Sequence, residues 1–129
     1  MDLNDCLEMT QKIEERKIVL ICRFVGGDLQ LICGGGDKAH IGAVSLAIPY
    51  RNDRGTLSAS VSTLTAPGHR DDAISRALAE RFAKELGRVT AAICGIHYEH
   101  ASPELLQKIQ KTVADMADEM VETLRGATL

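Results

Sequence analysis

The chain has 129 residues, of which 45% are hydrophobic and 26% charged, and its formal net charge is −3. This length suits one domain spanning residues 1–129, and the slight negative charge argues against nucleic acid as a partner. No apolar run approaches the ~20 residues of a membrane span, and the polar start shows no secretory signal. Four scattered cysteines without C-x-x-C spacing favour reduced thiols in the cytoplasm over a zinc or disulfide framework.

The first part of the chain is typical of β-structure. Residues 16–36 predict two strands joined by a turn at the tripeptide GGD. Apolar residues occupy both faces of the first of these strands, so we expect it to be buried on both sides. The first fifteen residues form an N-terminal extension whose pattern does not decide between a strand and a short helix.

Three further strands are predicted. Residues 40–50 predict a third strand, closed by Pro49, and residues 56–65 predict a fourth. A polar turn over 51–55 joins them into a hairpin. Residues 88–97 are apolar at nearly every position, so this fifth strand is expected at the centre of the sheet.

Two segments change to a helical period. Apolar residues at every fourth position predict a helix from about Arg70 to Gly87, and a second runs from the N-cap Ser102 to Gly126. The resulting order is β-β-β-β-α-β-α. We therefore predict an α+β fold, in which two helices pack on a mainly antiparallel sheet of about five or six strands.

The histidines all lie beside predicted boundaries. If the third and fifth strands are neighbours with aligned ends, His40 and His97 come close, and His69 joins them if its loop folds to the same rim. Three imidazoles, or two with the carboxylate of Asp71 or Glu99, would suit a transition metal. No H-E-x-x-H signature is present, and each histidine taken singly is explained as a surface or capping residue, so both interpretations stay open.

The glycine run suggests a second kind of site. Gly34, Gly35 and Gly36 leave bare backbone whose N–H groups could hold an anion. The helix beginning near Arg70 adds N–H groups and the positive end of its dipole, and Lys38 adds charge. A phosphate could bind between these two loops. The run matches neither a Walker A sequence nor a dinucleotide fingerprint, so a plain tight turn is an equal alternative.

Three separated motifs occur in order: GGGDKAHIGAVSLA at 34–47, GHRDDAISRALAERFAKELG at 68–87 and VTAAICGIHYEHAS at 89–102. With them the chain resembles, over about residues 16–109, the LpdD-like family, the small third subunit found beside UbiD-type decarboxylases, including gallate decarboxylase. The resemblance implies a proteasome assembly chaperone-like fold, usually paired as a homodimer. It also implies a chaperone rather than an enzyme: a protein that binds reduced prenylated flavin mononucleotide (FMN) and assists maturation of a UbiD-type aromatic acid decarboxylase.

The residue patterns and the resemblance together define an expected cofactor site. A divalent metal, with His40, His69 and His97 as its ligands, is a further candidate. Because the chain has few aromatic rings to stack on a flavin, Ile41 and Ile96 are expected to pack against it. Two other functions stay open: a small metal-dependent hydrolase using the same histidines, and a purely structural decarboxylase subunit. The expected cofactor-binding residues are Gly34, Gly35, Gly36, Lys38, His40, Ile41, Gly42, His69, Arg70, Gly95 and His97.

Overall fold

The computed structural model describes residues 5–67 and 70–127. The predicted order of strands and helices is confirmed, and the undecided N-terminal segment forms an additional strand at its start. The elements are β1 (Cys6–Ile13), β2 (Arg16–Val25), β3 (Asp28–Gly36), β4 (Ala43–Arg51), β5 (Leu57–Thr65), α1 (Asp72–Leu86), β6 (Thr90–His97) and α2 (Pro103–Arg125).

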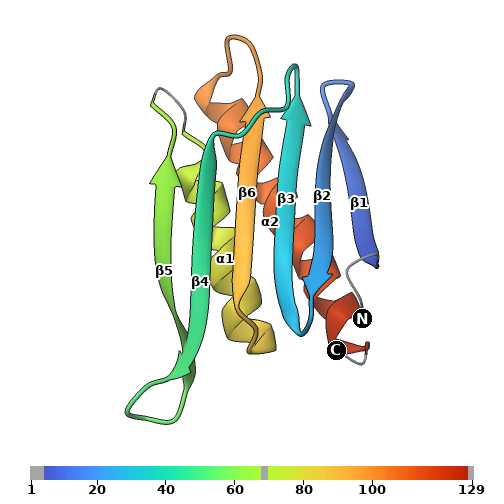
Figure 1. Ribbon diagram of the computed structural model, residues 1–129. Helices are drawn as coiled ribbons and strands as arrows, with labels where there is room; N and C mark the ends of the chain where they lie inside the picture. Colours follow the sequence, from blue (N-terminus) through green and yellow to red (C-terminus); the bar gives the residue numbers. More distant parts are fainter. Residues whose placement is uncertain (1–4, 68–69, 128–129) are drawn as a thin grey trace.

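The six strands form one sheet in the order β1-β2-β3-β6-β4-β5 (Figure 1). Neighbouring strands are antiparallel except β3 and β6, which run parallel. β6 lies between β3 and β4, as its nearly continuous apolar sequence predicted. Because β4 is antiparallel to β6, the start of β4 and the end of β6 lie side by side at the same end of the sheet, where the strands terminate.

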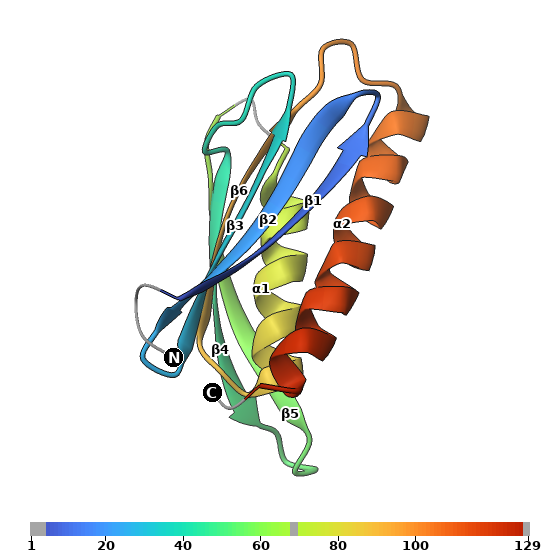
Figure 2. The same ribbon diagram turned by 90° about the vertical axis from the view of Figure 1, so that its right-hand side faces the viewer.

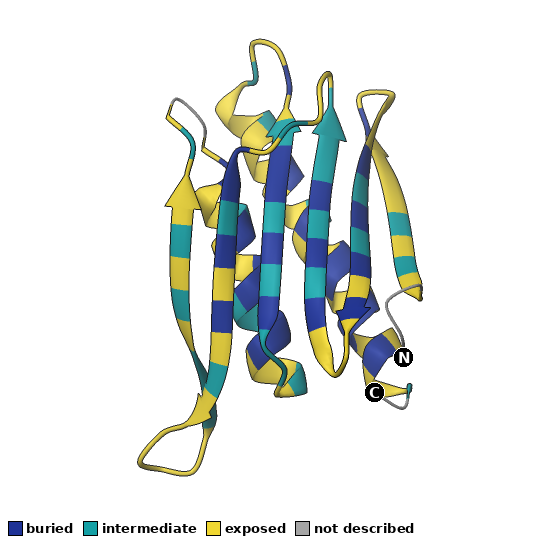
Figure 3. Cartoon of the chain, in the orientation of Figure 1, coloured by how far each residue is buried: buried dark blue, intermediate teal, exposed yellow. Residues whose placement is uncertain are grey.

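Both helices cover the same face of the sheet, and the other face has no helix on it (Figure 2). The prediction that β2 is buried on both sides is therefore wrong. Leu20 and Phe24 point under the helices and are buried, whereas Val25 is 55% exposed and Ile21 only half-buried. The same alternation follows the central strands, so buried and partly exposed residues alternate along them (Figure 3). We call the uncovered side the open face.

The core fills the space between the sheet and the helices. The apolar stripe of α2 and the buried side of α1 pack on the inward side chains of β2, β3 and β6. Three of the four free cysteines, Cys22, Cys33 and Cys94, belong to this core, and Cys6 is exposed. These three thiols act as small buried apolar groups.

Local signals set the helix ends as predicted. The hydroxyl of Ser102 accepts a hydrogen bond from the Leu105 N–H at 3.1 Å, and Gly87 ends α1 in the left-handed conformation. Pro49, by contrast, does not close β4, which continues to Arg51. Beyond Ala47, β4 no longer pairs with β6, so the proline lies where one side of the strand lacks a partner. Neither described helix combines the length and apolarity needed to cross a membrane.

Candidate ligand-binding site

The connection between β3 and β4 passes across the end of β6. The N–H of Gly42 donates to the Cys94 carbonyl at 2.9 Å, and a β-carbon on Gly95 would lie 1.6 Å from the His40 carbonyl oxygen. Only a glycine at position 95 allows this close approach. The crossing brings His40 beside His97, with ring centroids 6.3 Å apart in an edge-to-face arrangement.

Asp71 connects His40 to both α1 and β6. One carboxylate oxygen lies 3.0 Å from the His40 Nε2 atom, and the other accepts the Ile96 N–H at 3.0 Å. The residue is only 5% exposed, so these bonds offset the cost of burying its charge. A β-carbon on Gly42 would lie 2.0 Å from Asp71 Oδ2, which explains the glycine there. The contact between His40 and Asp71 fixes the His40 ring beside the end of β6.

The described residues do not assemble a metal site. His97 Nε2 lies 3.0 Å from Glu99 Oε1, and His40 Nε2 is engaged by Asp71. Within residues 5–67 and 70–127, no group of three or more His, Cys, Asp or Glu side chains is arranged to hold a metal ion. His69, the third expected ligand, lies outside the described residues. The donor set that the structure describes therefore does not fit a metal.

The glycine run is part of a strand, which corrects its prediction as an anion-binding or plain turn. Gly34–Gly36 form the end of β3: all three pair with β6, and Gly34 and Gly35 pair with β2 on the other side. A β-carbon on Gly35 would lie 2.1 Å from the Lys17 carbonyl oxygen, and one on Gly36 would lie 2.2 Å from that of His97. Both glycines also have positive φ angles, 147° and 81°. Their role is to let three backbones pack closely.

A cavity of about 490 Å³ opens beside the two histidines. It lies between the start of α1, the end of β6 and the first turns of α2. Among the expected site residues, His40, Arg70 and His97 line it, and so does Ile96; Gly34, Gly35, Gly36, Lys38, Ile41, Gly42 and Gly95 do not. The full lining is His40, Arg70, Asp71, Asp72, Ala73, Ile74, Ile96, His97, Tyr98, Ala101, Leu106, Ile109 and Gln110.

The charge at the cavity mouth comes mainly from the start of α1. Asp71 holds the N-cap position, but its side chain makes no capping hydrogen bond because it is turned to His40. The N–H groups in the first turn therefore have no acceptor from the N-cap side chain, and Arg70, just before α1, lines the same cavity. The carboxylate of Asp72, also at the mouth, adds the opposite charge. The arrangement can hold an anion at its cationic side.

Buried polar groups fix α1 and the cavity wall. The hydroxyl of Ser45 lies 2.8 Å from those of Ser75 and Thr63, which connects the first turns of α1 to β4 and β5. On the opposite side, the Tyr98 hydroxyl donates to the Ile13 carbonyl at 2.9 Å. Burial raises the pKa of Tyr98 above its ordinary value, so the phenol stays protonated and neutral.

Sequence reasoning missed the contribution of α2 to the cavity. Leu106, Ile109 and Gln110 line it, although only Ile109 belongs to the buried apolar stripe of α2. One signal was available: Leu106 lies outside that stripe and is 42% exposed. An apolar residue on the polar side of an amphipathic helix indicates a contact beyond the core.

The fold is that of a proteasome assembly chaperone. A chain in a crystal structure of a chaperone complex for yeast 20S proteasome assembly matches 92% of this chain and 96% of its own length, with a TM-score of 0.55 at 14% sequence identity. A family model described as the prenylated flavin chaperone LpdD-like domain matches residues 12–125. The chain therefore belongs to this family. No curated protein matches it.

Proposed function

We propose that the protein binds reduced prenylated FMN and delivers it to a UbiD-type aromatic acid decarboxylase. The observation that carries this proposal is the cavity of about 490 Å³, whose mouth combines Arg70, His40 and His97 in a member of a prenylated flavin chaperone family. Cavities of roughly 300–1,000 Å³ are usual for small-molecule ligands. In this function the chain protects and transfers the cofactor and performs no turnover.

The phosphate of the flavin is placed at the start of α1. Arg70 supplies a cation there, and the uncapped first turn supplies N–H donors, which together form a common kind of phosphate site. His40 and His97 then face the polar edge of the flavin ring system. The buried Asp71 acts as a positioning residue, because it holds the His40 ring in place. A divalent metal is not part of the proposal, because the described donors do not fit one.

The chain is proposed to pair as a homodimer through the open face. One row of apolar side chains crosses five strands in direct register on this face: Ile21, Ile32, Ile93, Val44 and Leu64. Leu46 and Ile48, both exposed, extend the row along β4. A continuous apolar surface of this kind favours burial against another surface, and a second copy offers the same row in return.

The decarboxylase is proposed to dock at the rim of the cavity, because the cofactor must pass directly between the two proteins. Ile41, which is highly exposed, lies in the connection that crosses the end of β6. Leu106 is exposed at the cavity wall on α2. Exposed apolar residues beside a ligand opening suit a transient protein contact.

Binding is tested by anaerobic titration of the protein with reduced prenylated FMN, followed by absorbance. We expect a complex with one flavin per chain. The Arg70→Gln variant should bind about tenfold more weakly, because it loses one charge-assisted contact to phosphate. Arg76→Gln is the matched control, since Arg76 is exposed on α1 and does not line the cavity. Absence of binding by the wild-type protein would refute the proposal.

Transfer is tested by mixing the loaded protein with apo-decarboxylase. We expect decarboxylase activity to appear faster than with the same concentration of free reduced cofactor under limited exposure to oxygen. Equal rates would contradict a delivery role while leaving cofactor binding intact.

A further inference from the structure

The cavity continues into a second one. A groove of about 240 Å³ runs between α1 and α2 and shares Ala73, Ile74 and Gln110 with the cavity beside the histidines. The two therefore form one continuous groove, which begins at the Arg70 end of the cavity and follows the helices away from it. Its far end is closed by Arg81, whose guanidinium pairs with Asp118 across the two helices.

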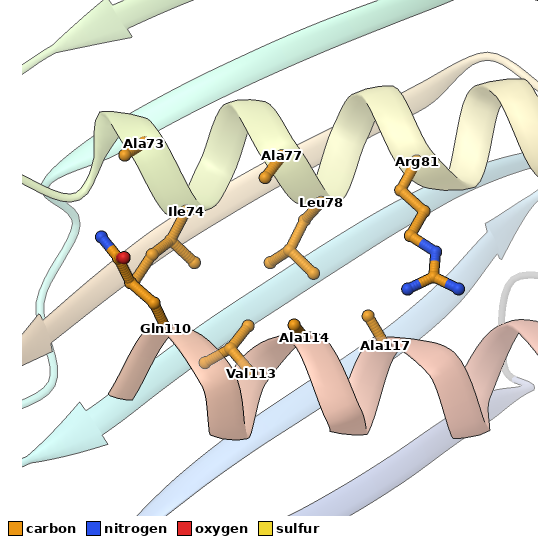
Figure 4. Close-up of a pocket in the computed structure, with 9 residues that line it drawn as sticks. All are labelled: Ala73, Ile74, Ala77, Leu78, Arg81, Gln110, Val113, Ala114 and Ala117. Atoms are coloured by element: carbon orange, nitrogen blue, oxygen red, sulfur yellow. The ribbon is translucent and has the colours of Figure 1, made fainter. Parts of the chain in front are cut away.

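The groove is almost entirely apolar. Leu78, Val113 and Ala117 form its buried floor, and the exposed Ala77 and Ala114 form its walls (Figure 4). Small side chains at the walls leave space above this floor, whereas a larger residue at either position would fill the groove. An apolar surface kept open to water beside a polar cavity favours a ligand that is polar at one end and apolar at the other.

We propose that the α1–α2 groove receives the apolar edge of the flavin ring system, with its prenyl-derived ring, while the phosphate lies at the Arg70 end. The inference rests on the proposed function and deepens it by giving the ligand a direction. The charges favour this direction, because Arg81 is already paired with Asp118, whereas Arg70 lies beside the uncapped start of α1.

The groove also supplies ring contacts that the aromatic residues do not. Phe24 and Phe82 are buried in the core, Tyr50 lies near the far end of β4, and Tyr98 lines the cavity beside the histidines but not the groove. Aliphatic side chains therefore contact the ring system. Among the two isoleucines expected from the sequence, Ile96 lines the cavity and Ile41 does not.

The experiment compares two ligands, reduced prenylated FMN and reduced FMN, which differ in the prenyl-derived ring. We expect the wild-type protein to bind the prenylated form about tenfold or more tightly, because the additional apolar group is buried in the groove. Ala77→Leu and Ala114→Leu should bring the ratio of the two affinities close to one. Lys108→Leu is the control, because it adds a leucine at an exposed position of α2 that lines neither cavity.

The outcomes separate this inference from the proposed function. If the wild-type protein binds neither flavin, the proposed function fails. If it prefers the prenylated form and both alanine variants, folded by circular dichroism, keep that preference, the groove inference is overturned. If both alanine variants bind the flavins as the wild-type protein does but no longer transfer the cofactor, the groove is a contact site for the decarboxylase and the inference is overturned. The contribution of the phosphate is the difference in affinity between the flavin and its dephosphorylated form. If Arg81→Gln rather than Arg70→Gln loses this difference, the ligand lies in the opposite direction and the inference is overturned.

Discussion

The α-carbon of Gly95 lies so close to the main-chain carbonyl of His40 that a β-carbon added to Gly95 would be 1.6 Å from the oxygen. The contact joins the end of β6 to the connection that carries His40, and thereby sets the position of one cavity wall. Because the obstructing atom is backbone, a side chain at position 95 can be accommodated only by moving this connection.

We therefore expect Gly95→Ala to lower the free energy of unfolding by about 2–3 kcal/mol and to weaken flavin binding. Urea denaturation and flavin titration measure the two effects. Gly126→Ala is the matched control: its φ angle is −78° and its added β-carbon meets nothing closer than 3.6 Å, so its effect should stay within about 0.5 kcal/mol. Equal stability of the two variants would contradict the contact.

The adjacent carboxylates Asp71 and Asp72 should have opposite effects on flavin binding. Asp72→Asn removes a negative charge from the cavity mouth, so reduced flavin should bind about threefold more tightly at low salt. Asp71→Asn removes the negative charge beside His40 and replaces one of the two acceptor oxygens by an NH2 donor, so it should weaken flavin binding and lower the free energy of unfolding by about 1–3 kcal/mol. Titration at two salt concentrations checks the sign, and identical shifts in both variants would disprove the assignment.

Leu46→Arg should convert the proposed homodimer into a monomer, because it places a charge within the apolar row of the open face. Leu106→Arg is a matched control, since both leucines are 42% exposed and only Leu46 lies on the sheet. Light scattering after size-exclusion chromatography gives the mass of each variant. A wild-type monomer, or dimers that persist in Leu46→Arg, would rule out pairing through this face.

The buried thiols should make the fold sensitive to alkaline pH. Burial raises the pKa of Cys22 to about 12, and a hydrogen bond with Cys33, together with burial, raises that of Cys94. Above pH 9 the thiols ionise in the unfolded chain but not in the folded protein. The free energy of unfolding therefore falls as the pH rises from 9 towards 12, by about 1.4 kcal/mol per pH unit for each thiol.

Urea denaturation between pH 9 and 11 tests this effect. Cys22→Ala should reduce the slope of stability against pH by about the contribution of one thiol. Cys6→Ala should change the slope less than Cys22→Ala does, because burial is the larger cause of the raised pKa of Cys22 and the neighbouring Cys6 is the smaller one. A Cys22→Ala protein with the wild-type slope would show that this thiol does not titrate differently in the two states.

The residue pattern alone was enough to predict the elements whose causes are local. Ser102, Gly87 and Gly126 mark the helix ends, because capping satisfies backbone groups within a few residues. Apolar residues recur every two residues in the strands and every three to four in the helices, and this difference distinguished the two kinds of element. The nearly continuous apolar run of β6 indicated its central position. The three separated motifs were specific enough to indicate the family.

Which faces of the sheet are covered and which side chains meet could be seen only in the folded protein. The pattern of β2 could not show that both helices lie on one side, because an apolar residue on an open face reads like a buried one. Asp71 holds the N-cap position of α1, yet its side chain turns to His40, thirty-one residues away in the sequence. Gly34 and Gly35 belong to a strand because β2 and β6 pair with them from both sides, and Gly36 extends the strand by pairing with β6. These outcomes depend on contacts between distant segments, and no local pattern encodes the packing that brings those segments together.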